Sequence, residues 1–90
     1  MSLLDVLESL GNIGLVPLAA VDRAEDAVDL AKALKAGGIG TVEITFRTEC
    51  AAEAIRQVKR KTSDFLVGAG TVINPDQAKK AVRAGADYIV

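Results

Sequence analysis

The chain contains no histidine and no tryptophan, and cysteine occurs only once, as Cys50. A single cysteine cannot form a disulfide within the chain, and without histidine it has neither a general base nor a second metal ligand of that type. We therefore interpret Cys50 as a small residue in the first turn of a helix and not as a nucleophile. No metal site is expected.

An excess of one charge and a long apolar run are also missing. The 11 basic and 12 acidic residues are interspersed and leave a formal net charge of −1, unlike the basic surface that binds a nucleic-acid backbone. No apolar run reaches the ~18 residues of a membrane span. The first residues, MSLLDVLESLG, carry acidic groups where a signal peptide carries basic ones. These features predict a cytoplasmic protein that binds neither nucleic acid nor a membrane.

The residues that are abundant are those of an aliphatic core. Of the 90 residues, 50% are hydrophobic and only 3% are aromatic. A composition dominated by Ala, Val, Leu, Ile and Gly is typical of α/β proteins and unlike that of disordered chains. This length suffices for one small domain and not for two. We expect the chain to be one folding unit or part of one.

Segments with the period of a strand alternate with segments with the period of a helix. Strands are predicted at residues 15–21, 41–46, 65–69 and 87–90. Helices are predicted at residues 2–11, between Asp22 and Gly37, between Thr48 and Lys61, and between Asn74 and Gly85. Each of the last three helices follows a strand, so the chain is a repeat of βα units. An internal echo supports the repeat, because DAVDLAKALKAGG and NPDQAKKAVRAGA align without gaps.

Residues that typically cap helices precede these helical segments. Asp22 and Glu25 have the spacing of a capping box, with Asp in place of the usual Ser or Thr. Thr48 is the expected cap of the next helix. The run Asn74-Pro75-Asp76-Gln77 supplies a cap, a proline at the first helical position and a capping box for the last helix. The inner stripe of that last helix is expected to contain Ala78, Ala81 and Val82.

Repeated βα units form either a doubly wound open sheet or a (β/α)8 barrel of the TIM type. We favour the barrel, because its usual size is ~250 residues in eight units and this chain holds about half of the eight units. The predicted fold is therefore α/β, a truncated half-barrel with a leading helix, about four strands and three helices. Residues 1–90 would be the N-terminal half of a single barrel domain.

The strand TVEITF indicates where chemistry could occur. Its apolar residues should contact the surrounding helices, so that Glu43 points toward the barrel axis. Burying a carboxylate without a partner costs several kcal/mol, and a glutamate in this position is a candidate general acid/base. The alternative is that Glu43 pairs with a lysine from another strand only to hold the core together.

Two further residues follow strands at the end where barrel enzymes bind ligands. Arg47, on the same alternation as Glu43, should also point inward, and its planar guanidinium suits a carboxylate or a phosphate. The alternative is a surface Arg47 paired with Glu49. In VGAGT, the glycines would let a ligand approach the backbone, and Thr71 could hydrogen-bond an anion. The dinucleotide-binding fingerprint is not met, because no third glycine follows at the required place.

Taken together, VEITFRTECAAEAIR and VGAGTVINPDQAKKAVRAGADYIV resemble the 2-keto-3-deoxy-6-phosphogluconate (KDPG) aldolase and 4-hydroxy-2-oxoglutarate (KHG) aldolase family. The similarity runs from about Val16 to Val90. It implies a (β/α)8 barrel, a class I aldolase whose lysine forms a Schiff base with pyruvate, no metal or other cofactor, and a homotrimer. The implied partner is a small keto acid that is bound by its pyruvate end.

The resemblance also implies roles for single residues. Glu43 matches the general acid/base that moves protons while the carbinolamine and the enamine form. Arg47 and Thr71 match the residues that bind the pyruvate carboxylate. The family's Schiff-base lysine lies on a strand beyond Val90, so half of the active site would lie outside this chain.

Two other functions remain open at this point. The chain could be a non-catalytic half-barrel that associates through its exposed edges. It could also belong to another phosphosugar barrel enzyme, an isomerase or a synthase, although the combination of Glu43, Arg47 and Thr71 favours the aldolase. The preferred keto-deoxy sugar acid depends on contacts outside the chain.

Overall fold

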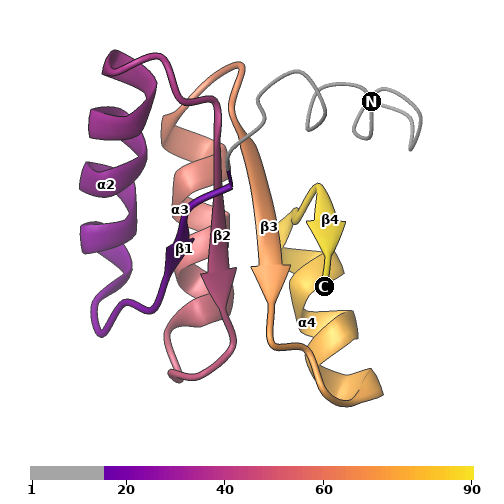
Figure 1. Ribbon diagram of the computed structural model, residues 1–90. Helices are drawn as coiled ribbons and strands as arrows, with labels where there is room; N and C mark the ends of the chain where they lie inside the picture. Colours follow the sequence, from indigo (N-terminus) through magenta and orange to yellow (C-terminus); the bar gives the residue numbers. More distant parts are fainter. Residues whose placement is uncertain (1–15) are drawn as a thin grey trace.

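The structure is a computed structural model that describes residues 16–90. Along the chain it contains three helices and four strands (Figure 1): β1 (Leu18–Ala19), α2 (Ala24–Ala36), β2 (Thr41–Thr45), α3 (Ala51–Lys61), β3 (Leu66–Gly70), α4 (Pro75–Ala84) and β4 (Tyr88–Ile89). The helix expected at 2–11 lies outside the described residues. Every other predicted element is present, although β1 and β4 are shorter than predicted. Among the described strands both are outer strands of the sheet, and each pairs with one neighbour through two residues.

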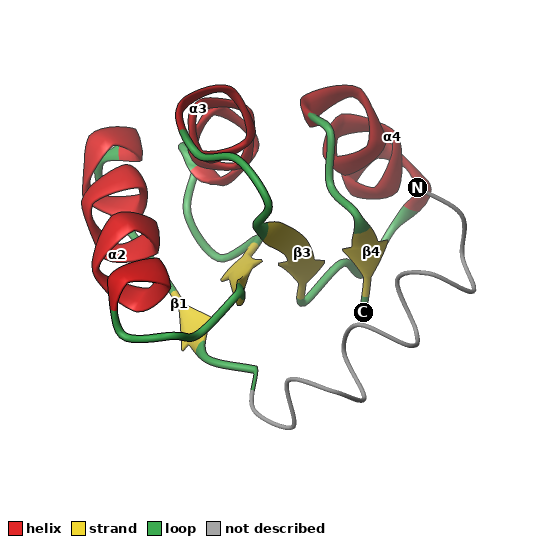
Figure 2. Cartoon of the chain, turned by 90° about the horizontal axis from the view of Figure 1, so that it is seen from above, coloured by secondary structure: helices red, strands yellow, loops and turns green. Residues whose placement is uncertain are grey.

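The four strands form one parallel sheet in the order β1-β2-β3-β4. A doubly wound sheet contains a point at which the strand order reverses, and none is present among these strands. The three helices lie side by side on one face of the sheet (Figure 2). The order of the strands and the single layer of helices are those of one side of a βα barrel, as expected from the sequence.

The hydrophobic core lies between the helices and the sheet. It contains apolar residues of β2 and β3 that point toward the helices, and the apolar residues of α2, α3 and α4 that face the sheet. Its fully buried members include Val42, Ile44, Val67, Ala69, Ala27, Ala31, Ile55, Val58 and Ala81. Burying a Val or Ile side chain contributes about 1.5–3 kcal/mol. This face of the sheet therefore supplies much of the stability and leaves the opposite face available for polar groups.

Of the predicted helix caps, that of α4 is confirmed. The Asn74 side chain accepts a hydrogen bond from Gln77 N, and Pro75 is the first helical residue. The Gln77 side chain accepts from Ile73 N in return. Val82, however, was wrongly placed on the inner stripe, because its side chain is 64% exposed. The buried residues of α4 are Ala81 and Ala84, which are three positions apart and leave Val82 on another side of the helix.

The two other predicted caps are wrong. Helix α2 begins after Arg23, not Asp22, and has no side-chain cap. Arg23 instead forms a surface ion pair with Glu25, with 2.6 Å between Arg23 Nη2 and Glu25 Oε1. Helix α3 begins after Cys50, and the Thr48 hydroxyl donates to the carbonyl of Val21 at 2.7 Å. The Thr48 hydroxyl therefore forms a tertiary hydrogen bond in place of the helix cap that the local sequence predicts.

Candidate functional site on the inward face of the sheet

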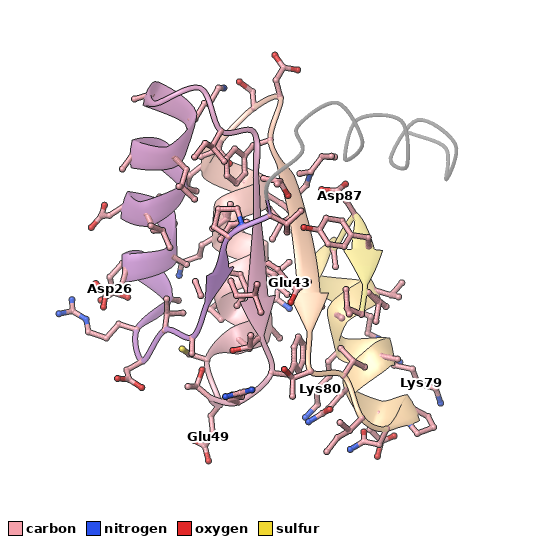
Figure 3. The ribbon with its side chains drawn as sticks, viewed as in Figure 1. Asp26, Glu43, Glu49, Lys79, Lys80 and Asp87 are labelled. Atoms are coloured by element: carbon pink, nitrogen blue, oxygen red, sulfur yellow. The ribbon has the colours of Figure 1, made fainter. Side chains whose placement is uncertain are left out.

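One row of residues in register crosses the face of the sheet that lies opposite the three described helices. We call this face the inward face. Leu18 is in register with Glu43, Glu43 with Gly68, and Gly68 with Tyr88. Residues in register on parallel strands project to the same side of the sheet. Glu43 lies in the middle of this face, in front of the helices (Figure 3). The predicted inward direction of Glu43 is confirmed.

The carboxylate of Glu43 lies beside Gly70. A Cβ atom added to Gly70 would be 2.8 Å from Glu43 Cδ and closer still to Oε2. Gly70 is two residues beyond Gly68, the register partner of Glu43, so the carboxylate leans toward the C-terminal end of the sheet. This is the end at which barrel enzymes bind their ligands.

Glu43 is 8% exposed. Among residues 16–90 no cation lies within ion-pair distance of its carboxylate, and no described side chain or backbone group forms a hydrogen bond with that carboxylate. Burial without a paired charge is costly. Such a carboxylate is suited to exchange a proton with a ligand, because no described partner has to be displaced first.

Tyr88 fills the space beside the other glycine of this face. A Cβ atom on Gly68 would be 2.7 Å from Tyr88 Cδ2 and closer to Cε2 and Cζ. The Tyr88 hydroxyl is 2.9 Å from Oγ1 of the buried Thr41. The two glycines were expected to let a ligand approach the backbone. In the structure, protein side chains occupy both of these spaces.

The environment of Tyr88 raises the pKa of its phenol above 10.0. Burial is the main cause, and the negative charges of Glu43 and Asp87 add to it, whereas the hydrogen bond with Thr41 acts in the opposite direction. Tyr88 therefore senses the charge of Glu43. No sequence pattern singles out Tyr88, because the register that places it beside Gly68 is a property of the folded sheet.

Arg47 follows the last residue of β2 by two positions. The strand ends at Thr45, so the alternation of inward and outward side chains no longer determines where Arg47 points. Arg47 is exposed and lines a hollow of about 260 Å³ together with Phe46, Thr48, Glu49, Ala52, Gln77 and Lys80. Figure 3 shows Glu49 and Lys80 toward the end of the molecule to which the strand arrows point. Arg47 forms no ion pair with Glu49 or with any other described residue.

Thr71 follows β3 directly and has a positive φ of 55°. A β-branched residue rarely adopts this left-handed conformation, which costs of order 1–3 kcal/mol and is concentrated at ligand sites. The side chain is exposed at the C-terminal end of the sheet, one residue after the glycine that contacts Glu43. Thr71 is therefore near the candidate acid/base and available to a ligand.

Cys50 lies at the start of α3, and its sulfur is 3.0 Å from the carbonyl oxygen of Val21. Within residues 16–90 no cluster of three acidic, cysteine or histidine side chains is arranged to hold a metal ion. None of the described helices combines the length and the apolar character needed to cross a membrane.

Comparison with known proteins decides the family. Residues 6–90 match the family model described as "Aldolase: KDPG and KHG aldolase". The chain belongs to the KDPG and KHG aldolase family. The resemblance seen in the sequence is confirmed, and so is the α/β fold of the (β/α)8-barrel class.

Three members of the KDPG and KHG aldolase family illustrate the similarity. The 2-dehydro-3-deoxy-phosphogluconate aldolase of Treponema pallidum is 44% identical over 88 residues, which are 98% of this chain and 42% of that protein. The enzyme of the same name from Dickeya dadantii is 47% identical over 76 residues, 84% of this chain and 36% of that protein. The KDPG aldolase of Legionella pneumophila, solved with pyruvate captured as a covalent carbinolamine intermediate, superposes with a TM-score of 0.77 at 43% identity, covering 82% of this chain and 36% of that one.

The chain therefore spans less than half the length of the relatives that it matches. Its lysines are Lys32, Lys35, Lys59, Lys61, Lys79 and Lys80. All of them lie on α2, α3 or α4 and none lies on a strand. Among residues 16–90, the inward face therefore carries an acid/base candidate, Glu43, but no lysine amine.

Proposed function

We propose that the whole protein, meaning this chain together with the remainder of a barrel, is a class I aldolase. It would cleave a 2-keto-3-deoxy-6-phospho sugar acid or 4-hydroxy-2-oxoglutarate and release pyruvate. The observation that carries the proposal is the position of Glu43 in a chain of this family. Its carboxylate is buried on the inward face, has no described cation as partner and leans toward the ligand-binding end of the sheet.

In this reaction an amine of the protein adds to the ketone carbon of the substrate, and water leaves to form a Schiff base. The C4 hydroxyl then loses its proton, the bond between C3 and C4 of the substrate breaks, its electron pair enters the enamine, and the aldehyde leaves. The enamine gains a proton at C3, and water hydrolyses the Schiff base to release pyruvate and restore the amine. Each of these steps needs a proton to move to or from an oxygen or carbon atom beside the amine. Glu43 would carry these protons, because it is within reach of the inward space and accepts or releases a proton without breaking an ion pair with any described residue.

The amine must come from outside residues 1–90. A lysine that forms a Schiff base has to be partly neutral near pH 7, which requires burial or a nearby cation. The lysines of this chain lie on helices, and Lys59 forms an ion pair with Asp87, with 2.8 Å between Lys59 Nζ and Asp87 Oδ2. We therefore expect the ninety residues alone to be a non-catalytic half-barrel.

Arg47 and Thr71 would bind the carboxylate at the pyruvate end of the substrate. Both follow strands at the C-terminal end of the sheet, and Arg47 has no described ion-pair partner that a carboxylate would have to displace. A bidentate contact with guanidinium is among the strongest that a carboxylate can form. The proposal includes a homotrimer, no metal and no other cofactor, which come from the family resemblance. It also includes a cytoplasmic location, which comes from the composition and charge pattern of the sequence.

Incubation of the whole protein with either acid tests the proposal. Pyruvate release is measured by coupling to lactate dehydrogenase, with and without a metal chelator. We expect release from at least one acid and no effect of the chelator. Treatment with pyruvate and borohydride should add one reduced adduct that maps outside residues 1–90. If neither acid is cleaved and no adduct forms, the proposal is wrong.

A further inference from the structure

The inward face offers two places beside β3 where a side chain from β2 or β4 can lie, one over Gly68 and one over Gly70. Gly68 is the register partner of Glu43, so the first place is as close to the Glu43 backbone as β3 allows. The Tyr88 ring occupies it. The Glu43 carboxylate lies in the second place, over Gly70.

We propose that Tyr88 is a positioning residue that holds the Glu43 carboxylate over Gly70 by filling the space over Gly68. The inference rests on the proposed function and deepens it, because it explains why the carboxylate is presented to the ligand-binding end of the strands. Without the ring, the carboxylate could turn toward Gly68 and away from the substrate.

The ring of Tyr88 is held at both of its ends. Beyond the ring, the hydroxyl is 2.9 Å from Thr41 Oγ1 at the start of β2. On the backbone side, Asp87 N donates to Val67 O at 2.7 Å and Val90 N donates to Ala69 O at 2.8 Å. These contacts leave the ring little freedom to move off Gly68.

The ring and the carboxylate are also coupled through charge. The negative charge of Glu43 is one of the causes that raise the pKa of the Tyr88 phenol, after burial, and Asp87 is the other charged group that does so. Removing the Glu43 charge should lower the pKa of Tyr88. Removing the Thr41 hydroxyl should raise it, since that hydrogen bond favours the phenolate.

This coupling can be measured directly, because Tyr88 is the only tyrosine of the chain and tryptophan is absent. Absorbance of the phenolate during a pH titration of the ninety-residue chain therefore reports Tyr88 alone, with circular dichroism recorded at each pH. We expect a pKa above that of free tyrosine, lowered by Glu43→Gln and raised by Thr41→Val. A titration that neither substitution moves would overturn the proposed juxtaposition.

Kinetics of the whole protein test the positioning role. Tyr88→Ala should lower kcat about 10- to 100-fold with little change in KM, because the acid/base is misplaced while the carboxylate contacts of the substrate remain. Tyr88→Phe should recover most of this loss, since the phenyl ring still fills the space over Gly68. Val82→Ala, at an exposed position of α4, is the matched control and should retain full activity.

A second variant acts on the other glycine. Gly70→Ala places a methyl group against the flexible end of Glu43, so the fold should persist while the carboxylate moves and kcat falls. If Tyr88→Ala folds with an unchanged kcat, or if Tyr88→Phe is as impaired as Tyr88→Ala, the positioning role is wrong. An unsubstituted whole protein that cleaves neither acid would instead refute the proposed function, and the titration would still decide the geometry.

Discussion

Glu43 is the residue on which the proposed chemistry depends, and one substitution can separate its role in proton transfer from its role in packing. We expect Glu43→Gln in the whole protein to lower kcat by about 10²- to 10⁴-fold, because the amide keeps the shape of the side chain but cannot transfer a proton. The free energy of unfolding should change little, since no described ion pair is lost. Steady-state kinetics and urea unfolding measure both effects. A variant with normal turnover would remove Glu43 from the mechanism.

Arg47 should contribute to substrate binding and not to stability. Its side chain is exposed and has no described ion-pair partner, so Arg47→Ala should leave the unfolding midpoint nearly unchanged. The KM for the keto acid should rise, because a charge-assisted contact with the carboxylate is lost. Arg60→Ala, an exposed arginine near the end of α3, is the control. Equal KM values for the two variants would place Arg47 outside the substrate site.

Thr71 is expected to combine strain with binding. Glycine adopts a positive φ without the steric cost that threonine incurs at 55°. Thr71→Gly should therefore unfold at the same or a higher temperature, although glycine makes the unfolded chain more flexible. The same variant should bind the keto acid less tightly, because its hydroxyl is gone. A clear loss of stability together with unchanged affinity would contradict both parts of this expectation.

At the level of secondary structure elements, one carboxylate joins α3, β3 and the start of β4. Asp87 Oδ2 accepts a hydrogen bond from the backbone N of buried Val67 at 2.8 Å. The same oxygen forms an ion pair with Lys59 Nζ, also at 2.8 Å. Lys59 also donates to the carbonyl of Phe65 at 3.2 Å. The contact ties the C-terminal turn of the helix to the N-terminal ends of two strands.

We predict that the acceptor in this contact matters more than the cation. Asp87→Ala should lower the free energy of unfolding by about 1–3 kcal/mol, because it leaves a buried backbone donor without a partner. Lys59→Met should cost less than about 1 kcal/mol, since the pair is partly exposed. Asp87→Asn, which keeps an oxygen for Val67 N, should fall between them. Urea unfolding followed by circular dichroism orders the three variants, and a larger effect of Lys59→Met would refute the prediction.

The helix caps show how far local sequence predicts an element. Asn74 was correctly predicted because its partner, Gln77 N, is three residues away in the same helix. Thr48 was not, because the carbonyl that its hydroxyl reaches belongs to Val21, 27 positions earlier in the chain. A cap is thus predictable where the competing acceptors are local, and unpredictable where a segment far away in the sequence supplies one.

At the scale of the whole molecule, the sheet formed by residues 16–90 has two edges that no other described strand covers. Strand β1 and strand β4 each have one neighbour, and large exposed apolar side chains lie on both, with Leu18 70% and Ile89 42% exposed. Open parallel edges and exposed apolar groups favour association. The described part of the chain therefore presents the surfaces that a further set of barrel strands would cover.

We predict that the ninety-residue chain alone does not remain monomeric. Sedimentation velocity at micromolar concentration should show species larger than one chain. Leu18→Lys combined with Ile89→Lys should shift the distribution toward the monomer, because charged side chains on edge strands oppose pairing. Val82→Lys, at an apolar position on a helix whose exposure of 64% lies between those of Leu18 and Ile89, is the control. A single monomer peak with cooperative unfolding would contradict the prediction.

The sequence by itself determined the α/β class, the order of the described helices and strands, and the inward direction of Glu43. These features depend on periodic patterns of apolar residues and on neighbours within a few positions, so they can be read along the chain. The family was recognisable for the same reason, because its signature lies in two continuous segments. The alternation within β2 placed Glu43 on its polar side, and the repeat of βα units along the chain indicated that this side faces the barrel axis.

Only the tertiary structure decided what surrounds Glu43. The hydroxyl of Tyr88 meets Thr41 across 47 positions of the chain, and two side chains from different strands fill the spaces that Gly68 and Gly70 leave. β2 ends at Thr45, two residues before Arg47, so the direction of the Arg47 side chain depends on the loop and not on the strand alternation. Contacts of this kind depend on register and on the volume left by residues far apart in sequence, and no local pattern encodes either quantity.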